Sequence, residues 1–147
     1  MSRALAAAII LSLGLAGCVS TAPLAGEPDF SFLTGGRVSG AELEARIRKA
    51  SAYPLGSRDN PVRVDMPAGQ QAYLNRLRCS DGQRPTYGRA GNFGAGVYGS
   101  IIDGYRVVCP DGGQPAEGMI YMDMYHPAHD EVAAPPGFTL AGRARQP

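Results

Sequence analysis

The sequence predicts a single small α+β domain, in which one N-terminal helix packs on a small, mainly antiparallel β-sheet and the loops are rich in glycine. One segment has helical periodicity and a helix start signal, whereas the apolar residues after it come in short alternating runs between turns. Glycine and proline are abundant, at 20 and 12 of 147 residues, and tryptophan is absent. A chain of this length fits one domain and not two.

The first 18 residues have the organisation of a secretion signal. Arg3 supplies a positive charge, residues 4–13 form an apolar stretch too short to span a bilayer, and the tetrapeptide Leu-Ala-Gly-Cys follows at 15–18. This ending resembles the lipobox of bacterial lipoproteins, in which the chain is cut before a cysteine that carries a diacylglyceryl group. The resemblance implies a signal peptide over residues 1–17 and a membrane-anchored, palmitate-bearing mature chain that begins at Cys18.

Val19 follows the lipidation site where lipoproteins retained in the inner membrane have aspartate. By the sorting pattern of Gram-negative lipoproteins, this resemblance implies an outer-membrane protein that faces the periplasm. Residues 18–36 contain several prolines and glycines without periodicity, so we expect a lipidated N-terminus and linker. Residues 37–147 then form the folded domain, with an irregular C-terminal tail.

Charge excludes one class of partner. The chain has 14 basic and 13 acidic residues, and Arg3 is the one charged residue of the leader, so the mature chain is formally neutral. A neutral chain of mixed charge lacks the basic stripe that nucleic-acid binding requires, and we expect no nucleic-acid partner.

Residues 40–52 are expected to form the one helix. Ser39 and Glu42 have the spacing of a capping box, which satisfies two free amides at a helix start. Leu43, Ile47 and Ala50 then recur on one face, and Tyr53-Pro54 ends the run.

Strands are expected in four places after the helix. Residues 62–65 alternate, and so do residues 100–109 and 118–126. The 100–109 strand is apolar on both faces, so it should lie inside the sheet. Residues 70–79 fit a helix and a strand about equally, and the Asp81-Gly82 turn signal favours the strand.

Two of the three cysteines share the pattern Cys-x-Asp-Gly-x-x-Pro, which starts at Cys79 and at Cys109. Each copy ends a predicted strand with a cysteine and continues into an Asp-Gly turn, so two hairpins should carry their cysteines at matching ends. Outside the cytosol such a pair is expected to form a disulfide.

The glycine-rich segment 88–99 is expected to be a loop. Residues 94–99 match Gly-x-Gly-x-x-Gly, but the dinucleotide-binding fingerprint needs a strand before it and a helix after it, so we expect no nucleotide. Asn92, Phe93 and Tyr98 would make this loop a binding edge for an envelope protein or a small ligand.

Both histidines lie in one short segment with acidic neighbours. His126 and His129 flank Pro127, and Asp123 and Asp130 lie close by in the sequence. Two imidazoles and a carboxylate are sufficient for an open Zn²⁺ site, although His-x-x-His outside a helix has no fixed geometry. The alternative is a strand end with ordinary polar groups.

The mature chain also resembles small, uncharacterised proteobacterial lipoproteins, over the run that extends from Asn60–Asp65 to Met122–Pro127 and covers most of the mature chain. That resemblance implies no activity. We therefore expect a membrane-anchored envelope lipoprotein with a non-catalytic binding or structural role and no cofactor. The alternative is a metal-dependent or acid–base enzyme that acts on an envelope substrate through Asp123, His126 and His129.

Overall fold

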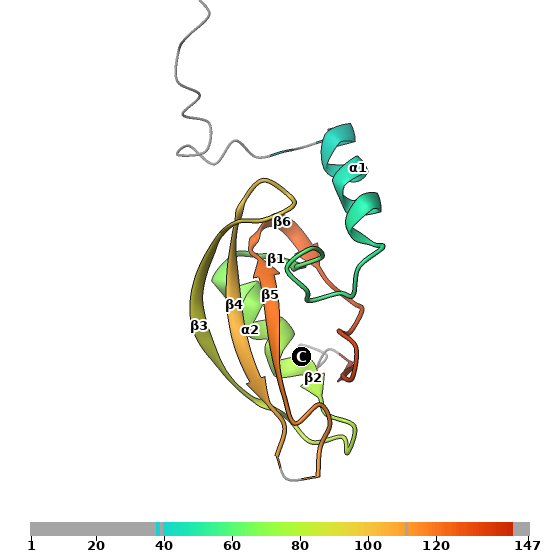
Figure 1. The fold of residues 1–147 in the computed structure, drawn as a ribbon, viewed down its shortest axis with the longest axis vertical. Helices are drawn as coiled ribbons and strands as arrows, with labels where there is room; N and C mark the ends of the chain where they lie inside the picture. The colour runs from blue at the N-terminus through green and yellow to red at the C-terminus, as the bar shows by residue number, and fades with distance from the viewer. Residues whose placement is uncertain (1–37, 39, 111, 143–147) are drawn as a thin grey trace, which may run out of the picture.

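The computed structural model describes residues 38, 40–110 and 112–142, which fold into helices and strands in the α+β class (Figure 1). The elements in chain order are α1 Gly40–Ala50, β1 Val62–Asp65, α2 Met66–Arg76, β2 Leu77–Arg78, β3 Thr86–Ala95, β4 Ile101–Val108, β5 Glu117–Asp123, β6 Tyr125–Asp130 and β7 Thr139–Leu140. Within this part of the chain, no helix has both the length and the apolar character needed to cross a membrane.

The main sheet has five strands in the order β3-β4-β5-β1-β6. β3, β4 and β5 form an antiparallel meander, and β6 is antiparallel to β1. β1 runs parallel to β5, with Val62 opposite Met122. The sheet is thus mainly antiparallel, as predicted, and β4 lies inside it between β3 and β5. A second, two-stranded sheet pairs β2 with β7.

The predicted strand over residues 70–79 is wrong, because most of that segment belongs to α2. Pro67 lies in the first turn of the helix, where its missing N–H costs nothing. Gln70, Tyr73 and Leu74 lie on one buried face at helical spacing. Only Leu77 and Arg78 are extended.

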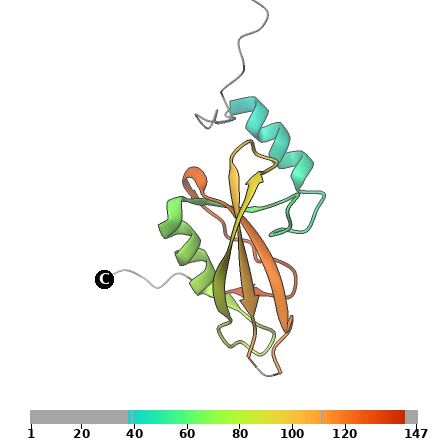
Figure 2. The same cartoon turned by 60° about the vertical axis from the view of Figure 1, so that its left-hand side comes forward.

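The two helices have different relations to the sheet (Figure 2). α2 lies along one face, against β1 and β6. α1 lies beyond one end of the sheet, and only its last residue, Ala50, is buried. The predicted packing of an N-terminal helix on the sheet is therefore not supported, since α2 takes that place. The predicted capping box rests on Ser39, which lies outside the described residues.

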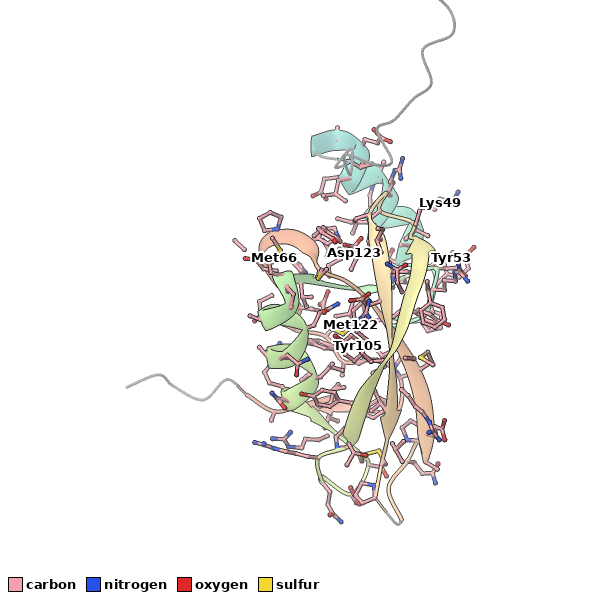
Figure 3. All side chains as sticks on the ribbon, turned by 90° about the vertical axis from the view of Figure 1, so that its left-hand side faces the viewer. Lys49, Tyr53, Met66, Tyr105, Met122 and Asp123 are labelled. Atoms are coloured by element: carbon pink, nitrogen blue, oxygen red, sulfur yellow. A yellow bond between two sulfur atoms is a disulfide. The ribbon has the colours of Figure 1, made fainter. Side chains whose placement is uncertain are left out.

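The hydrophobic core lies between α2 and the sheet. Figure 3 shows Tyr105 of β4 and Met122 of β5 in this layer, where both are buried. The rest of the cluster includes Val62, Val64, Tyr73, Leu74, Leu77, Val107 and Ile120.

The predicted disulfide between Cys79 and Cys109 is confirmed, with the two Cα atoms 6.0 Å apart. Cys109 begins the turn of the β4–β5 hairpin, where its amide donates to the carbonyl of Ala116. Cys79 follows β2, which pairs with β7, so only one of the two predicted hairpins exists in the sheet. The bond ties the end of the α2–β2 segment to the meander.

The predicted loop at 88–99 is also wrong over most of its length, because residues up to Ala95 belong to β3. Two irregularities in the β3–β4 register, at Arg89/Gly91 and Asn92/Ala95, interrupt the pairing. Gly94 there has a φ of 78°, which a residue with a side chain rarely adopts. Glycine therefore permits bulges in a continuous strand.

Candidate functional site

A cleft of about 340 Å³ opens beside α1. Its walls come from four parts of the chain: the start of the domain with α1, strand β1, the turn between β3 and β4, and strand β6. The residues that matter for its chemistry are Val38, Leu43 and Ile47 on the α1 side, Arg63 of β1, Tyr98 and Ser100 of the turn, and His126 and His129 of β6.

The shape of β6 brings its histidines to the cleft. Two consecutive residues of β1 pair with residues of β6 that are five positions apart: Asp65 lies opposite Tyr125, and Val64 lies opposite Asp130. Residues 126–129 therefore have no partner in β1. The carboxylate of Asp65 accepts a hydrogen bond from the amide of Ala128, whose φ is 59°. The segment around Pro127, for which a strand end was the alternative to a metal site, is therefore an irregularity within one strand.

Asp123 is the polar centre of the wall behind the cleft. Its side chain is completely buried. Its Oδ2 accepts a hydrogen bond from Ser100 Oγ at 2.5 Å, and its Oδ1 accepts one from the Tyr125 amide at 3.0 Å. His126 Nε2 lies 3.4 Å from the same Oδ2. A buried carboxylate needs such partners, because desolvation without them is costly.

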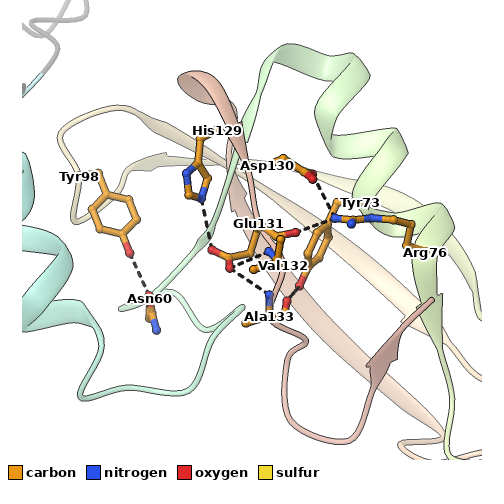
Figure 4. Close-up of polar contacts among 9 residues, drawn as sticks. All are labelled: Asn60, Tyr73, Arg76, Tyr98, His129, Asp130, Glu131, Val132 and Ala133. Atoms are coloured by element: carbon orange, nitrogen blue, oxygen red, sulfur yellow. Dashed lines mark hydrogen bonds and ion pairs between the residues drawn. The ribbon is translucent and has the colours of Figure 1, made fainter. Parts of the chain in front are cut away.

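His126 is 8% exposed, and among the described residues its Nε2 has no hydrogen-bond partner. The contact with Asp123 is within ion-pair distance but lacks hydrogen-bond alignment. The imidazole packs edge-on against Tyr98, with ring centroids 5.3 Å apart. Tyr98 is buried, and this burial raises the pKa of its phenol, which donates to Asn60 Oδ1 at 2.9 Å (Figure 4).

His129 lies next to His126, with ring centroids 6.4 Å apart. Its Nε2 is 3.5 Å from Glu131 Oε2, as Figure 4 shows. Burial lowers the pKa of His129, and the nearby Arg63 guanidinium lowers it further, against the opposite effect of Glu131. The environment therefore favours the neutral form of the imidazole.

Arg63 brings a positive charge to the cleft. Its guanidinium carbon lies 5.9 Å from the centroid of the Tyr98 ring. None of the ion pairs between described residues involves Arg63. The guanidinium therefore has hydrogen-bond donors free for a ligand.

The residues predicted as a metal site separate into two groups. Asp123 contacts His126, and His129 packs beside His126, whereas Asp130 Oδ1 accepts a hydrogen bond from Arg76 at 3.1 Å, away from the cleft (Figure 4). Over the described ranges, no three or more His, Cys, Asp or Glu side chains are grouped so that they could hold a metal ion.

The three residues of the predicted binding loop also separate. Asn92 Oδ1 accepts a hydrogen bond from the Gly94 amide, within β3. Phe93 packs edge-on against Tyr121 of β5, at 5.1 Å between centroids, and lies over Gly104, where a Cβ would collide with its ring. Only Tyr98 reaches the cleft.

Sequence reasoning missed Arg63 and Ser100. Arg63 alternates with buried Val62 and Val64, which marks it as facing away from the core but does not show what lies on that side. Nothing in the local sequence of Ser100 indicates its contact with Asp123.

Comparison with known proteins found no matching family model, no similar curated protein and no similar solved structure.

Proposed function

We propose that the protein is a lipid-anchored envelope protein whose domain is a non-catalytic module that binds a small ligand in the cleft beside α1. The observation that carries this proposal is the Arg63 guanidinium in the lining of the cleft, which is in no ion pair among the described residues. A few polar groups among apolar side chains are typical of the lining of a ligand site. The apolar side chains of α1 that line the same cleft supply the apolar contacts.

The hydrogen bonds of the cleft favour binding over covalent catalysis. A nucleophilic serine needs a base within hydrogen-bond reach of its hydroxyl. Ser100 Oγ donates to the Asp123 carboxylate rather than to an imidazole, and this carboxylate, a weaker base than histidine, also accepts from the Tyr125 amide. These contacts stabilise the wall, and they use the one hydrogen that the Ser100 hydroxyl can donate.

Blocking the cleft tests the binding function. We expect Leu43→Trp to weaken ligand binding by about tenfold or more, equivalent to about 1.4 kcal/mol, because the indole would occupy the space beside α1. The probes are 4-methylpentanoate, 4-methylpentylammonium and 4-methylpentanamide, which share one apolar body. With about eight non-hydrogen atoms at about 0.5 kcal/mol each, a fitting probe should bind with a Kd of about 1 mM.

Isothermal titration of the full chain in detergent measures this binding. The control is Ala90→Trp, which adds the same side chain at an exposed position of β3, outside the cleft lining. It should bind as the original chain does. Absence of saturable binding for all three probes, or equal binding by the two tryptophan variants, would refute the proposal.

The anchoring part of the proposal rests on the lipobox at residues 15–18. We expect the mature chain to begin at Cys18 with diacylglyceryl and amide-linked acyl groups, and to fractionate with the outer membrane. Two or more acyl chains hold a protein on a membrane durably, whereas one does not. Mass spectrometry of the N-terminal peptide from membrane fractions measures this, with Cys18→Ala as the control. An unmodified Cys18, or a mature chain that still begins at Met1, would contradict it.

An acid–base enzyme is the second candidate, favoured by the 3.4 Å contact between His126 Nε2 and Asp123 Oδ2 at the cleft. In its Zn²⁺-dependent form, His126 and His129 would be ligands. Calorimetric titration with Zn²⁺ distinguishes that form. One-to-one binding that disappears in His126→Ala and His129→Ala would place it above the binding module, and an absence of heat would remove it.

A further inference from the structure

The charges around the cleft indicate which ligand it takes. The lining includes one arginine, Arg63, one glutamate, Glu44, and the two histidines of β6. Behind the wall, the Asp123 carboxylate already accepts from Ser100 and Tyr125. Neither Arg63 nor Glu44 is in an ion pair among the described residues, and Arg63 is half-buried whereas Glu44 is exposed, so Arg63 is the charge that a ligand inside the cleft meets.

We propose that the ligand is a small organic carboxylate with an apolar body, an inference that rests on the binding function proposed above. A carboxylate matches a guanidinium because both are planar and form two parallel hydrogen bonds. The apolar body then lies against Leu43 and Ile47 of α1.

A monoanion fits this cleft better than a phosphate dianion. Arg63 can balance one negative charge. A second negative charge on the ligand would be repelled by Glu44 of the lining and by the buried Asp123. This repulsion is stronger where water is partly excluded, so it disfavours binding of the dianion. An ammonium ligand, in turn, would be repelled by Arg63.

Head groups on a constant apolar body test this inference on the unaltered protein. We expect 4-methylpentanoate to bind at least about tenfold more tightly than the matched amide and ammonium, and more tightly than 4-methylpentyl phosphate at pH 8, where the phosphate is a dianion. Because this comparison needs no substitution, it does not depend on how any variant folds. Tighter binding of the amide, ammonium or phosphate probe would overturn the carboxylate assignment.

Arginine variants locate the anion. Arg63→Gln should reduce 4-methylpentanoate affinity by about tenfold or more and leave the weak amide binding unchanged, because only the charged head group loses its partner. Arg106→Gln is the matched control, since Arg106 is an exposed arginine on β4 that pairs with Glu117. Equal carboxylate affinity in the two variants would refute the role of Arg63.

The two proposals can fail separately. If the amide binds best and Leu43→Trp removes its binding, the cleft is a binding site but not one for carboxylates. If none of the four probes binds, both proposals fail.

Discussion

Replacing Cys79 and Cys109 together by alanine is expected to lower the free energy of unfolding by about 3–4 kcal/mol. The disulfide closes a loop between positions 30 residues apart, and in the chain-entropy model a loop of this length restricts the unfolded chain by about that amount. Small domains are stable by about 5–15 kcal/mol in total, so the loss would be a large share. Urea unfolding followed by far-UV circular dichroism measures it.

Reduction of the unaltered chain is the control for this variant. Reduction breaks the same bond but keeps both side chains. Most of the decrease in the free energy of unfolding should therefore appear in the reduced chain as well as in the double variant. A loss below about 1 kcal/mol in the double variant would show that the unfolded chain is not restricted as this model requires.

Asp103→Ala is expected to cost about 2–4 kcal/mol, because it leaves a buried amide without its acceptor. Asp103 Oδ2 accepts from Gln70 Nε2 at 3.2 Å, and its Oδ1 accepts from Arg89 at 2.6 Å. Gln70 is buried in α2, and its Oε1 accepts from Tyr105 of β4 at 2.9 Å. The carboxylate therefore connects the helix to the sheet inside the core.

Two companion variants separate the causes of that loss. Asp103→Asn keeps an oxygen that can accept from Gln70, so it should cost less than half as much. Arg89→Ala should cost about 1 kcal/mol, since the Arg89 side chain is 50% exposed and its contact is partly screened. Equal losses in Asp103→Ala and Arg89→Ala, by urea unfolding, would assign the effect to the ion pair and contradict the buried network.

The sequence was sufficient for elements with a clear period. The alternating runs predicted β1, β4 and β5 within a few residues, and the repeated cysteine pattern predicted the disulfide. The fold class followed from these elements. A local alternating pattern does not show which other strand each strand pairs with. The parallel pairing of β1 with β5 could therefore not be predicted.

The two wrong elements share a cause, since non-local contacts decide their structure. In α2, the buried face includes the polar Gln70, whose partners are Asp103 and Tyr105 on the sheet, so the helical apolar stripe is incomplete in the sequence. In β3, glycines weaken the strand pattern, and the Phe93 ring fits over Gly104 of the neighbouring strand.

In the candidate site, the sequence likewise identified most of the residues but not their arrangement. Tyr98, Asp123, His126 and His129 were chosen for their chemistry and meet at one end of the sheet. The sequence treated Tyr98 and the histidines as parts of two separate sites. Tyr98 and the histidines lie together because of the register of β4 with β5 and the irregularity in β6. No local sequence pattern shows either feature.

The parallel pairing of β1 with β5 has a consequence for the order of folding. β3, β4 and β5 pair with neighbours in sequence, whereas Val62 must meet Met122 across the whole meander, so its loop-closure entropy is larger. β1 should therefore pair with β5 after the meander has formed, and Arg63 joins the sheet with it. The cleft then exists only in the complete domain, and its occupation is linked to global unfolding. A ligand at one hundred times its Kd would raise the free energy of unfolding by about 2.7 kcal/mol.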